Sequence, residues 1–197
     1  MRRLLTLATL GIALLAAASA RAEDMSGNVQ FFVGQRWLGD EWQPIDEPAI
    51  FGVEVDFAPQ SSPIRVALAS FMAADSQDIG SGTFLGDTGD VDIGFFELSA
   101  GFLWLPVKQG VARPYLGAGA LMMGAVIGSN WDWFEDNDFD HSFGFYGTAG
   151  VYFKVGDTFN IGMDGRIVRG TEFSFAGTEI DGDYEQVSLL LGFSWGK

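Results

Sequence analysis

The sequence predicts an all-β protein, folded as an eight-stranded antiparallel up-and-down β-barrel that spans a membrane. Three observations predict this fold class: alternation of apolar with small or polar side chains, connections of alternating length, and an N-terminal export signal. Of the 197 residues, 48% are hydrophobic and only 19% are charged. This composition is too apolar for a disordered chain and is short of charge for an ordinary soluble surface.

Residues 1–22 have the pattern of a secretory signal peptide that is cleaved on export. Two arginines precede an apolar run at 4–18, and small residues follow the run. Cleavage after Ala20 or after Ala22 fits the small-x-small rule, and the second site leaves residues 23–197 as the barrel domain. The run is short of the roughly 20 apolar residues that a membrane-spanning helix needs.

Eight alternating segments follow the signal. Successive side chains of a strand point to opposite faces, so each segment has one oily face and one small or polar face. The oily face of the last segment consists of Val187, Leu189, Leu191, Phe193 and Trp195. The expected strands cover residues 27–38, 49–57, 63–73, 92–105, 113–127, 142–155, 158–169 and 185–195.

The oily face of these strands is predicted to point outward into lipid. Eight strands enclose a lumen only wide enough for side chains, and the small or polar face suits that space better. A closed barrel is also the only sheet that crosses lipid with every backbone group paired. The alternative is a soluble barrel with its apolar face inward.

The connections alternate between short and long, as in outer-membrane barrels with short periplasmic turns and long outer loops. The long ones are expected at 39–48, 74–91, 128–141 and 170–184. Aromatic residues are expected to form two girdles at the membrane surfaces. The loop-side girdle would contain Trp37, Trp42, Trp131, Trp133 and Phe134. The other girdle would contain Phe57, Trp104, Phe153, Phe159 and Trp195.

Three segments carry a likeness to a known family: residues 113–120 (RPYLGAGA), the hairpin between 143 and 164, and residues 190–195 (LLGFSW). With these segments the chain resembles the small OmpA/OmpX-type outer-membrane β-barrels. The resemblance implies the barrel architecture and an outer-membrane location. It also implies that the insertion machinery of the outer membrane recognises the last strand, which here ends at Trp195 and is followed by two more residues.

Acidic residues concentrate in the expected outer regions. Residues 39–48, 73–92, 128–141 and 170–185 hold 4, 5, 5 and 5 acidic residues, 19 of the 26 in the chain, and no lysine or arginine. The simpler interpretation is that these charges keep the loops soluble. A sharper one is that they hold divalent cations that bridge to lipopolysaccharide phosphates, because hard cations prefer carboxylate oxygens. The densest candidate contains Asp132, Glu135, Asp136, Asp138 and Asp140.

Charged residues are expected inside the barrel as well. Alternation predicts that eight of them point into the lumen: Arg36, Glu54, Asp56, Arg65, Glu97, Lys154, Asp164 and Arg166. Unpaired charges in so narrow a space would cost several kcal/mol, so we expect a paired network that fills the lumen, with Asp164 and Arg166 at its centre. The alternative is a narrow, gated path for ions or solutes.

The composition excludes several classes of function. A chain with no cysteine and one histidine offers no disulfide framework and no multi-histidine or thiolate metal site. A net charge of −15 opposes nucleic-acid binding. His141 beside Ser142 raises the alternative of a lipid A-modifying enzyme, but neighbouring strand residues point to opposite faces and no Gly-x-Ser-x-Gly elbow occurs.

We therefore expect a non-enzymatic, integral outer-membrane protein with a structural, adhesive or other surface-interaction role. No cofactor is expected. The expected partners are outer-membrane lipid and lipopolysaccharide, and the barrel is expected to be a monomer.

Overall fold

The computed structural model describes residues 25–43, 45–79, 89–107, 110–128, 138–175 and 178–196. The strands are β1 (Met25–Leu38), β2 (Ala49–Pro59), β3 (Ile64–Ile79), β4 (Gly89–Trp104), β5 (Ala112–Gly128), β6 (Asp138–Val155), β7 (Phe159–Arg169), β8 (Glu172–Phe175), β9 (Thr178–Asp181) and β10 (Tyr184–Trp195). One 3₁₀ helix, η2 (Asp40–Trp42), follows β1. The expected signal peptide lies outside the described residues. In the described part of the chain, no helix is long and apolar enough to cross a membrane.

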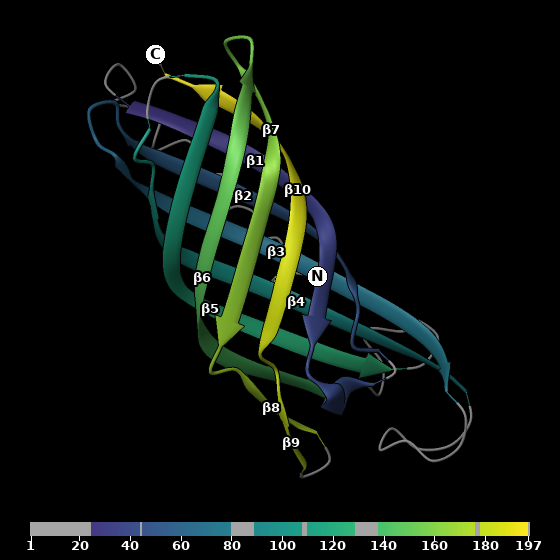
Figure 1. Cartoon of the computed structure of the whole chain (residues 1–197). Helices are drawn as coiled ribbons and strands as arrows, with labels where there is room; N and C mark the ends of the chain where they lie inside the picture. Colours follow the sequence, from purple (N-terminus) through teal and green to yellow (C-terminus); the bar gives the residue numbers. More distant parts are fainter. Residues whose placement is uncertain are drawn as a thin grey trace, which may run out of the picture.

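Eight of the strands close into one barrel, in the order β1-β10-β7-β6-β5-β4-β3-β2 (Figure 1). Every neighbouring pair is antiparallel, and β1 closes the barrel because it pairs with both β10 and β2. At one point Gly27 lies opposite Trp195 on one side and opposite Phe57 on the other. The predicted eight-stranded antiparallel barrel is confirmed, and its closed sheet leaves no edge of unpaired backbone groups.

The oily faces of the strands point outward, as the alternation predicts. On β10, Leu189 is 60% exposed, whereas its neighbours Ser188 and Leu190 are buried. Large apolar side chains are exposed in the same way on all eight barrel strands. Such a continuous apolar belt on a closed barrel is stable in contact with acyl chains and not in water.

Small residues on the inner face make room for large inward rings. Gly101 and Gly119 lie opposite each other on β4 and β5. A Cβ atom on Gly101 would lie 2.5 Å from the Tyr146 hydroxyl, and one on Gly119 would lie 2.7 Å from a carbon of the same ring. Gly101 and Gly119 are therefore required by close packing inside the lumen.

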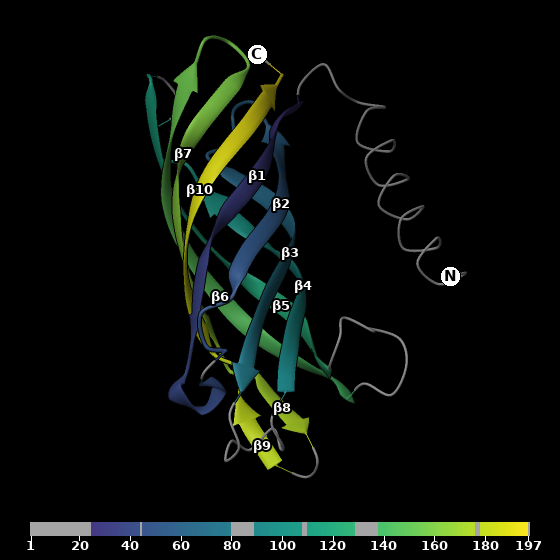
Figure 2. The same ribbon diagram turned by 90° about the vertical axis from the view of Figure 1, so that its right-hand side faces the viewer.

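The start of β1, the end of β10 and the short connections lie at the same end of the barrel (Figure 2). The turn between β6 and β7 is the shortest of the connections at this end, and Gly156 adopts a φ of 71° there, which glycine does without strain. The opposite end carries η2 and the separate two-stranded sheet β8–β9, which lies within the connection from β7 to β10. We refer to these as the periplasmic and the extracellular ends.

Several strands are longer than the sequence predicts. β3 runs to Ile79, β4 begins at Gly89 and β6 begins at Asp138, so parts of two expected loops are strands. In these segments the alternation of apolar with polar residues disappears from the sequence, so the pattern could not predict them as strands. β8 and β9 were likewise expected to be loop, since four residues are too few for a periodic pattern.

The girdle prediction is correct in part. Trp37, Trp104, Phe153, Phe159 and Trp195 are all exposed, whereas Phe57 is half-buried. Trp42 was expected at the lipid surface, but it is fully buried, because η2 turns it into the mouth of the barrel. Residues 131, 133 and 134 lie outside the described residues.

Candidate functional site

Five apolar side chains close the extracellular mouth of the lumen, and we call this cluster the outer plug. It consists of Trp42, Ile45, Phe95, Phe173 and Ile180, all at most 3% exposed. The Trp42 ring lies 5.2 Å from the Phe95 ring and 6.1 Å from the Phe173 ring, with interplanar angles of 71° and 84°. Edge-to-face contacts of this kind stabilise aromatic clusters beyond the area they bury. The plug therefore joins β4 to two connections that are far apart in the sequence.

Hydrogen bonds tie the first connection to β9. The Trp42 indole Nε1–H donates to the carbonyl oxygen of Asp181 at 2.6 Å. The backbone N–H of Asp181 donates to a carboxylate oxygen of Glu41 at 3.1 Å. Within the first connection, the Ile45 N–H donates to the Trp42 carbonyl oxygen at 2.9 Å. These bonds hold η2 and the β8–β9 hairpin as one unit over the mouth.

Side chains of β6 accept hydrogen bonds from the backbone N–H groups along one edge of β8. The N–H of Glu172 donates to Ser142 Oγ at 2.8 Å, and the N–H of Ser174 donates to Asp140 Oδ2 at 2.6 Å. Asp140 also accepts from the N–H of His141 at 2.7 Å. The two backbone N–H donors, Ser174 first, hold the pKa of Asp140 below its usual value. The edge of β8 is thus docked on the barrel by side chains instead of a backbone ladder.

Acidification should release this docking. A group whose pKa is lowered in the folded state stabilises that state above its unfolded pKa, and the stabilisation is lost as the pH falls through the lowered value. For Asp140 this loss lies below pH 3.8. We expect the Ser174 amide to exchange slowly at neutral pH and to lose protection in that acidic range. Asp140→Asn should show the loss already at neutral pH, as measured by hydrogen exchange.

The exposed face of the hairpin has the opposite pH dependence. Glu179, the main cause, raises the pKa of Glu172 by charge repulsion. A raised folded pKa means that this contribution to stability is complete below pH 4.5 and is lost as the pH rises through the raised value. Glu179→Gln should therefore slow exchange of the hairpin amides at neutral pH. Unchanged or faster exchange would contradict this repulsion.

The predicted divalent-cation site falls largely outside the described residues. This applies to Asp132, Glu135 and Asp136, whereas Asp138 is the first residue of β6. The Asp140 carboxylate is engaged by backbone N–H groups. Among the residues that the structure describes, no group of three or more histidine, aspartate or glutamate side chains is placed to hold a metal ion.

Beneath the outer plug, Glu97 is the centre of a buried charge cluster. Its Oε1 accepts from Arg166 Nη2 at 2.5 Å, and its Oε2 accepts from Arg36 Nη2 at 3.2 Å and from the Tyr184 hydroxyl. Arg36, Glu97 and Arg166 are at most 2% exposed. The sequence predicted Asp164 with Arg166 as the centre, but Arg166 pairs with Glu97 from β4 instead.

Aromatic rings complete this layer across the lumen. The Arg36 guanidinium lies 3.7 Å above the Tyr184 ring, and the Arg166 guanidinium lies 3.8 Å from the centre of the Tyr146 ring. Arg36 also donates through Nε and Nη2 to the Gln186 side-chain oxygen at 3.3 and 3.2 Å. Cation–π contacts strengthen where water is excluded. Neither tyrosine was among the residues expected in the charge network, although strand parity places both on the inward face.

The two acidic residues in the middle of the lumen have different surroundings. Asp164 Oδ2 accepts from the Tyr115 and Thr148 hydroxyls, each at 2.6 Å. Glu54 is 4% exposed and makes no ion pair or hydrogen bond with a described residue. Its nearest charged neighbours include the carboxyls of Asp56 and Asp164 as well as Arg166. Glu54 is therefore part of the lumen filling without being paired.

A second charge cluster lies toward the periplasmic end. Asp56 binds the Arg65 guanidinium and accepts from the Asn28 amide at 2.9 and 3.0 Å and from the Gln30 amide at 3.1 Å. Arg65 also donates to Ser26, at 2.7 Å to its carbonyl oxygen. Lys154, expected in the lumen network, is instead half-buried at the periplasmic mouth.

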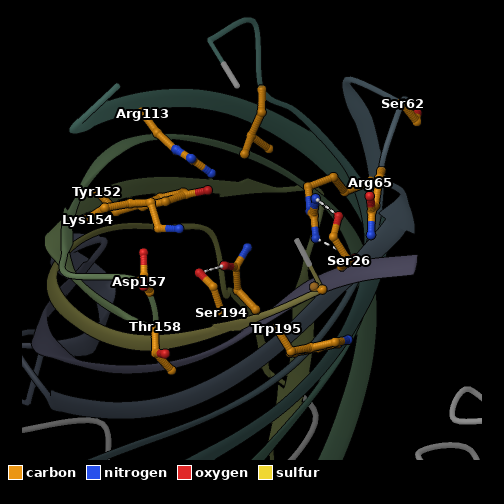
Figure 3. A pocket seen from close by; sticks show the side chains of 15 residues that line it. Ser26, Ser62, Arg65, Arg113, Tyr152, Lys154, Asp157, Thr158, Ser194 and Trp195 are labelled. Atoms are coloured by element: carbon orange, nitrogen blue, oxygen red, sulfur yellow. Dashed lines mark hydrogen bonds between the residues drawn. The ribbon is translucent and has the colours of Figure 1, made fainter. Parts of the chain in front are cut away.

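The periplasmic mouth contains a cavity of about 670 Å³ (Figure 3). Its lining includes Arg65, Arg113, Tyr152 and Lys154. Arg113 was not among the residues expected in the lumen. Its position in β5 could have indicated an inward side chain, because it lies two residues before the inward-facing Tyr115.

His141 and Ser142 do not form a catalytic pair. His141 is exposed, whereas Ser142 is buried and its Oγ accepts the Glu172 N–H. The His141 Nδ1 atom lies 3.9 Å from Asp140, and the ring contacts Phe143. The serine is therefore engaged in docking β8, on the opposite face of the strand from the imidazole.

Solved structures with the same fold are outer-membrane proteins. OprG from Pseudomonas aeruginosa has a TM-score of 0.61 and 14% identity, covering 89% of this chain and 97% of that chain. Ail, the attachment invasion locus protein of Yersinia pestis, has a TM-score of 0.60 and 14% identity, covering 87% and 99%. Neisserial surface protein A has a TM-score of 0.57 and 12% identity, covering 86% and 96%. No protein-family model and no curated protein sequence matches the chain.

The closed barrel, the apolar belt and these likenesses define a small β-barrel protein of the bacterial outer membrane. The predicted resemblance to OmpA/OmpX-type barrels is confirmed in fold. Because the identities are 12–14%, activity has to be inferred from this chain's own side chains.

Proposed function

We propose that this protein is a non-enzymatic, non-conducting outer-membrane barrel that presents a preformed acidic surface to a partner outside the cell. One observation carries the proposal: the outer plug and the Glu97 cluster are two consecutive buried layers across the lumen. The same residues that close the lumen fix η2 and the β8–β9 hairpin in place. The contacts that close the lumen therefore also hold the exposed extracellular surface in a fixed position.

This arrangement favours a surface role over a channel. Eight strands leave no aqueous path unless the inward side chains are small. Here the lumen is crossed by Trp42 and Phe173 in one layer. In the next layer it is crossed by two arginines, each stacked on a tyrosine ring. An ion path would require both layers to open together.

The partner is inferred to be cationic, or anionic and bridged by divalent cations. The exposed hairpin carries Glu172 and Glu179, whose repulsion raises the pKa of Glu172. The structure of Ail contains the heparin analogue sucrose octasulfate, a polyanion. The acidic hairpin of this chain is unsuited to a bare polyanion, so lipopolysaccharide would need Ca²⁺ or Mg²⁺ between the two acidic surfaces.

Binding and conductance together test the proposal. The refolded barrel in lipid nanodiscs is mixed with lipopolysaccharide in Ca²⁺ or in EDTA, and separately with polylysine. We expect binding to polylysine, and binding to lipopolysaccharide only in Ca²⁺. The double variant Glu172→Gln/Glu179→Gln should weaken both several-fold, and the same preparation should be silent in a planar bilayer.

The control for charge is Asp157→Asn, which changes an acidic residue in the β6–β7 turn at the periplasmic end. It should bind both probes as the wild type does. Steady conductance of the wild type, or binding that the hairpin substitutions leave unchanged, would contradict the proposal.

A further inference from the structure

The cavity at the periplasmic mouth has no part in the extracellular surface proposed above. It lies at the opposite end of the lumen, below the Asp56–Arg65 cluster. Figure 3 shows Arg113, Tyr152 and Lys154 reaching toward its centre from one wall, with Arg65 on the other. With a volume of about 670 Å³, it is large enough for a small ligand.

The lining of this cavity carries more positive than negative charge. Three basic residues, Arg65, Arg113 and Lys154, contribute to it, against one acidic residue, Asp157. Arg65 is compensated by its ion pair with Asp56. Arg113 makes no ion pair with any described residue. The cavity therefore contains one guanidinium charge without a counter-charge from the described protein.

Arg113 also lacks a hydrogen-bond acceptor for one of its N–H groups. Its Nε atom is buried and has no hydrogen-bond partner among the residues that the structure describes. The side chain contacts the hydroxyl of Tyr152, which is 2% exposed. A buried donor on a charged group is costly when it is left unsatisfied, more so than on a neutral group. The missing partner has to be an acceptor, and an anionic acceptor would also balance the charge.

We propose that this cavity binds an oxyanion of the phosphate class, held by the Arg113 guanidinium and the Tyr152 hydroxyl. The planar fork of a guanidinium presents parallel N–H donors that match the oxygens of a phosphate group. The hydroxyl of Thr158, also in the lining, adds a neutral donor beside the same space. The phosphate is supplied by a periplasmic solute or by the headgroup of an inner-leaflet phospholipid, which share this chemistry.

The Arg113 Nε–H signal in a ¹H–¹⁵N NMR spectrum reports on the site directly. The whole barrel is refolded in a phosphate-free detergent and titrated with inorganic phosphate at constant ionic strength. We expect a saturable shift of this signal. Arg113→Gln should lower the affinity for phosphate, measured by calorimetry, about tenfold or more. Arg169→Gln, which alters an exposed arginine at the extracellular end, is the matched control and should leave the affinity unchanged.

Two further experiments distinguish a soluble phosphate from a lipid headgroup and control for misfolding of the Arg113 variant. Tyr152→Phe keeps the charge and the ring and should weaken binding less than Arg113→Gln does. In phospholipid nanodiscs, an Arg113 signal that is already shifted and no longer responds to free phosphate identifies the lipid headgroup as the occupant. A response that persists there identifies a soluble phosphate. Folded barrels that show no saturable shift with phosphate and no shift in phospholipid would overturn the proposal.

Discussion

Glu97→Gln is expected to destabilise the folded barrel by about 3–5 kcal/mol, the cost typical of breaking a buried ion pair by removing one partner. The Glu97 carboxylate is the only acidic group that pairs with Arg36 and Arg166 among the described residues. Both guanidiniums are essentially buried, so neither can recover its lost partner from water. The amide keeps the shape of the carboxylate but removes the charge that compensates two cations.

The matched control for this substitution is Glu54→Gln. Glu54 is also an inward, buried glutamate, but it has no ion pair with a described residue and lies near two other carboxyls. We expect Glu54→Gln to be neutral or to stabilise the barrel. The measurement is urea unfolding of both variants in the same lipid, followed by tryptophan fluorescence. Equal losses in the two variants would mean that the ion pairs of Glu97 add nothing to what an unpaired buried glutamate contributes, and the paired network would then have no energetic role.

This pair of glutamates also shows what the sequence can and cannot predict. Strand parity was sufficient to place both inside the barrel, because alternation fixes the face of a residue. It could not indicate the partners, since Glu97 meets Arg36 and Arg166 across 61 and 69 residues of chain. Those contacts depend on how far each strand is shifted along its neighbour, and alternation contains no information on that shift.

The connections were less predictable than the strands for a related reason. Trp42 looks like a girdle residue because it follows an outward Trp37 near the end of β1. Its real position depends on a 3₁₀ turn and on contacts with Phe173 and Asp181, more than 130 residues later. A loop has no periodicity from which such contacts can be inferred. Arg113 differs from Trp42, because its parity with the inward Tyr115, two residues later in the same strand, was readable from the sequence.

Trp42→Ala is expected to open the extracellular end of the barrel. Truncating a fully buried tryptophan typically costs about 3–5 kcal/mol, through lost burial and the cavity left behind. Here the loss also removes the indole donor to the Asp181 carbonyl oxygen. Because the β8–β9 hairpin has no ladder with the barrel strands, most of this cost should fall on its docking. The barrel strands themselves should remain folded.

Hydrogen exchange measures this local opening. The amides of β9 should lose protection by about 100-fold or more in Trp42→Ala, the factor that corresponds to about 3 kcal/mol. Trp37→Ala is the matched control, because Trp37 is the same residue type only five positions away and 40% exposed on the outer face. It should leave the hairpin protected. Conductance should stay absent in Trp42→Ala, since the Glu97 cluster still crosses the lumen. If ions pass through this variant, the outer plug alone keeps the wild-type barrel closed, and the buried charge cluster lines a gated path.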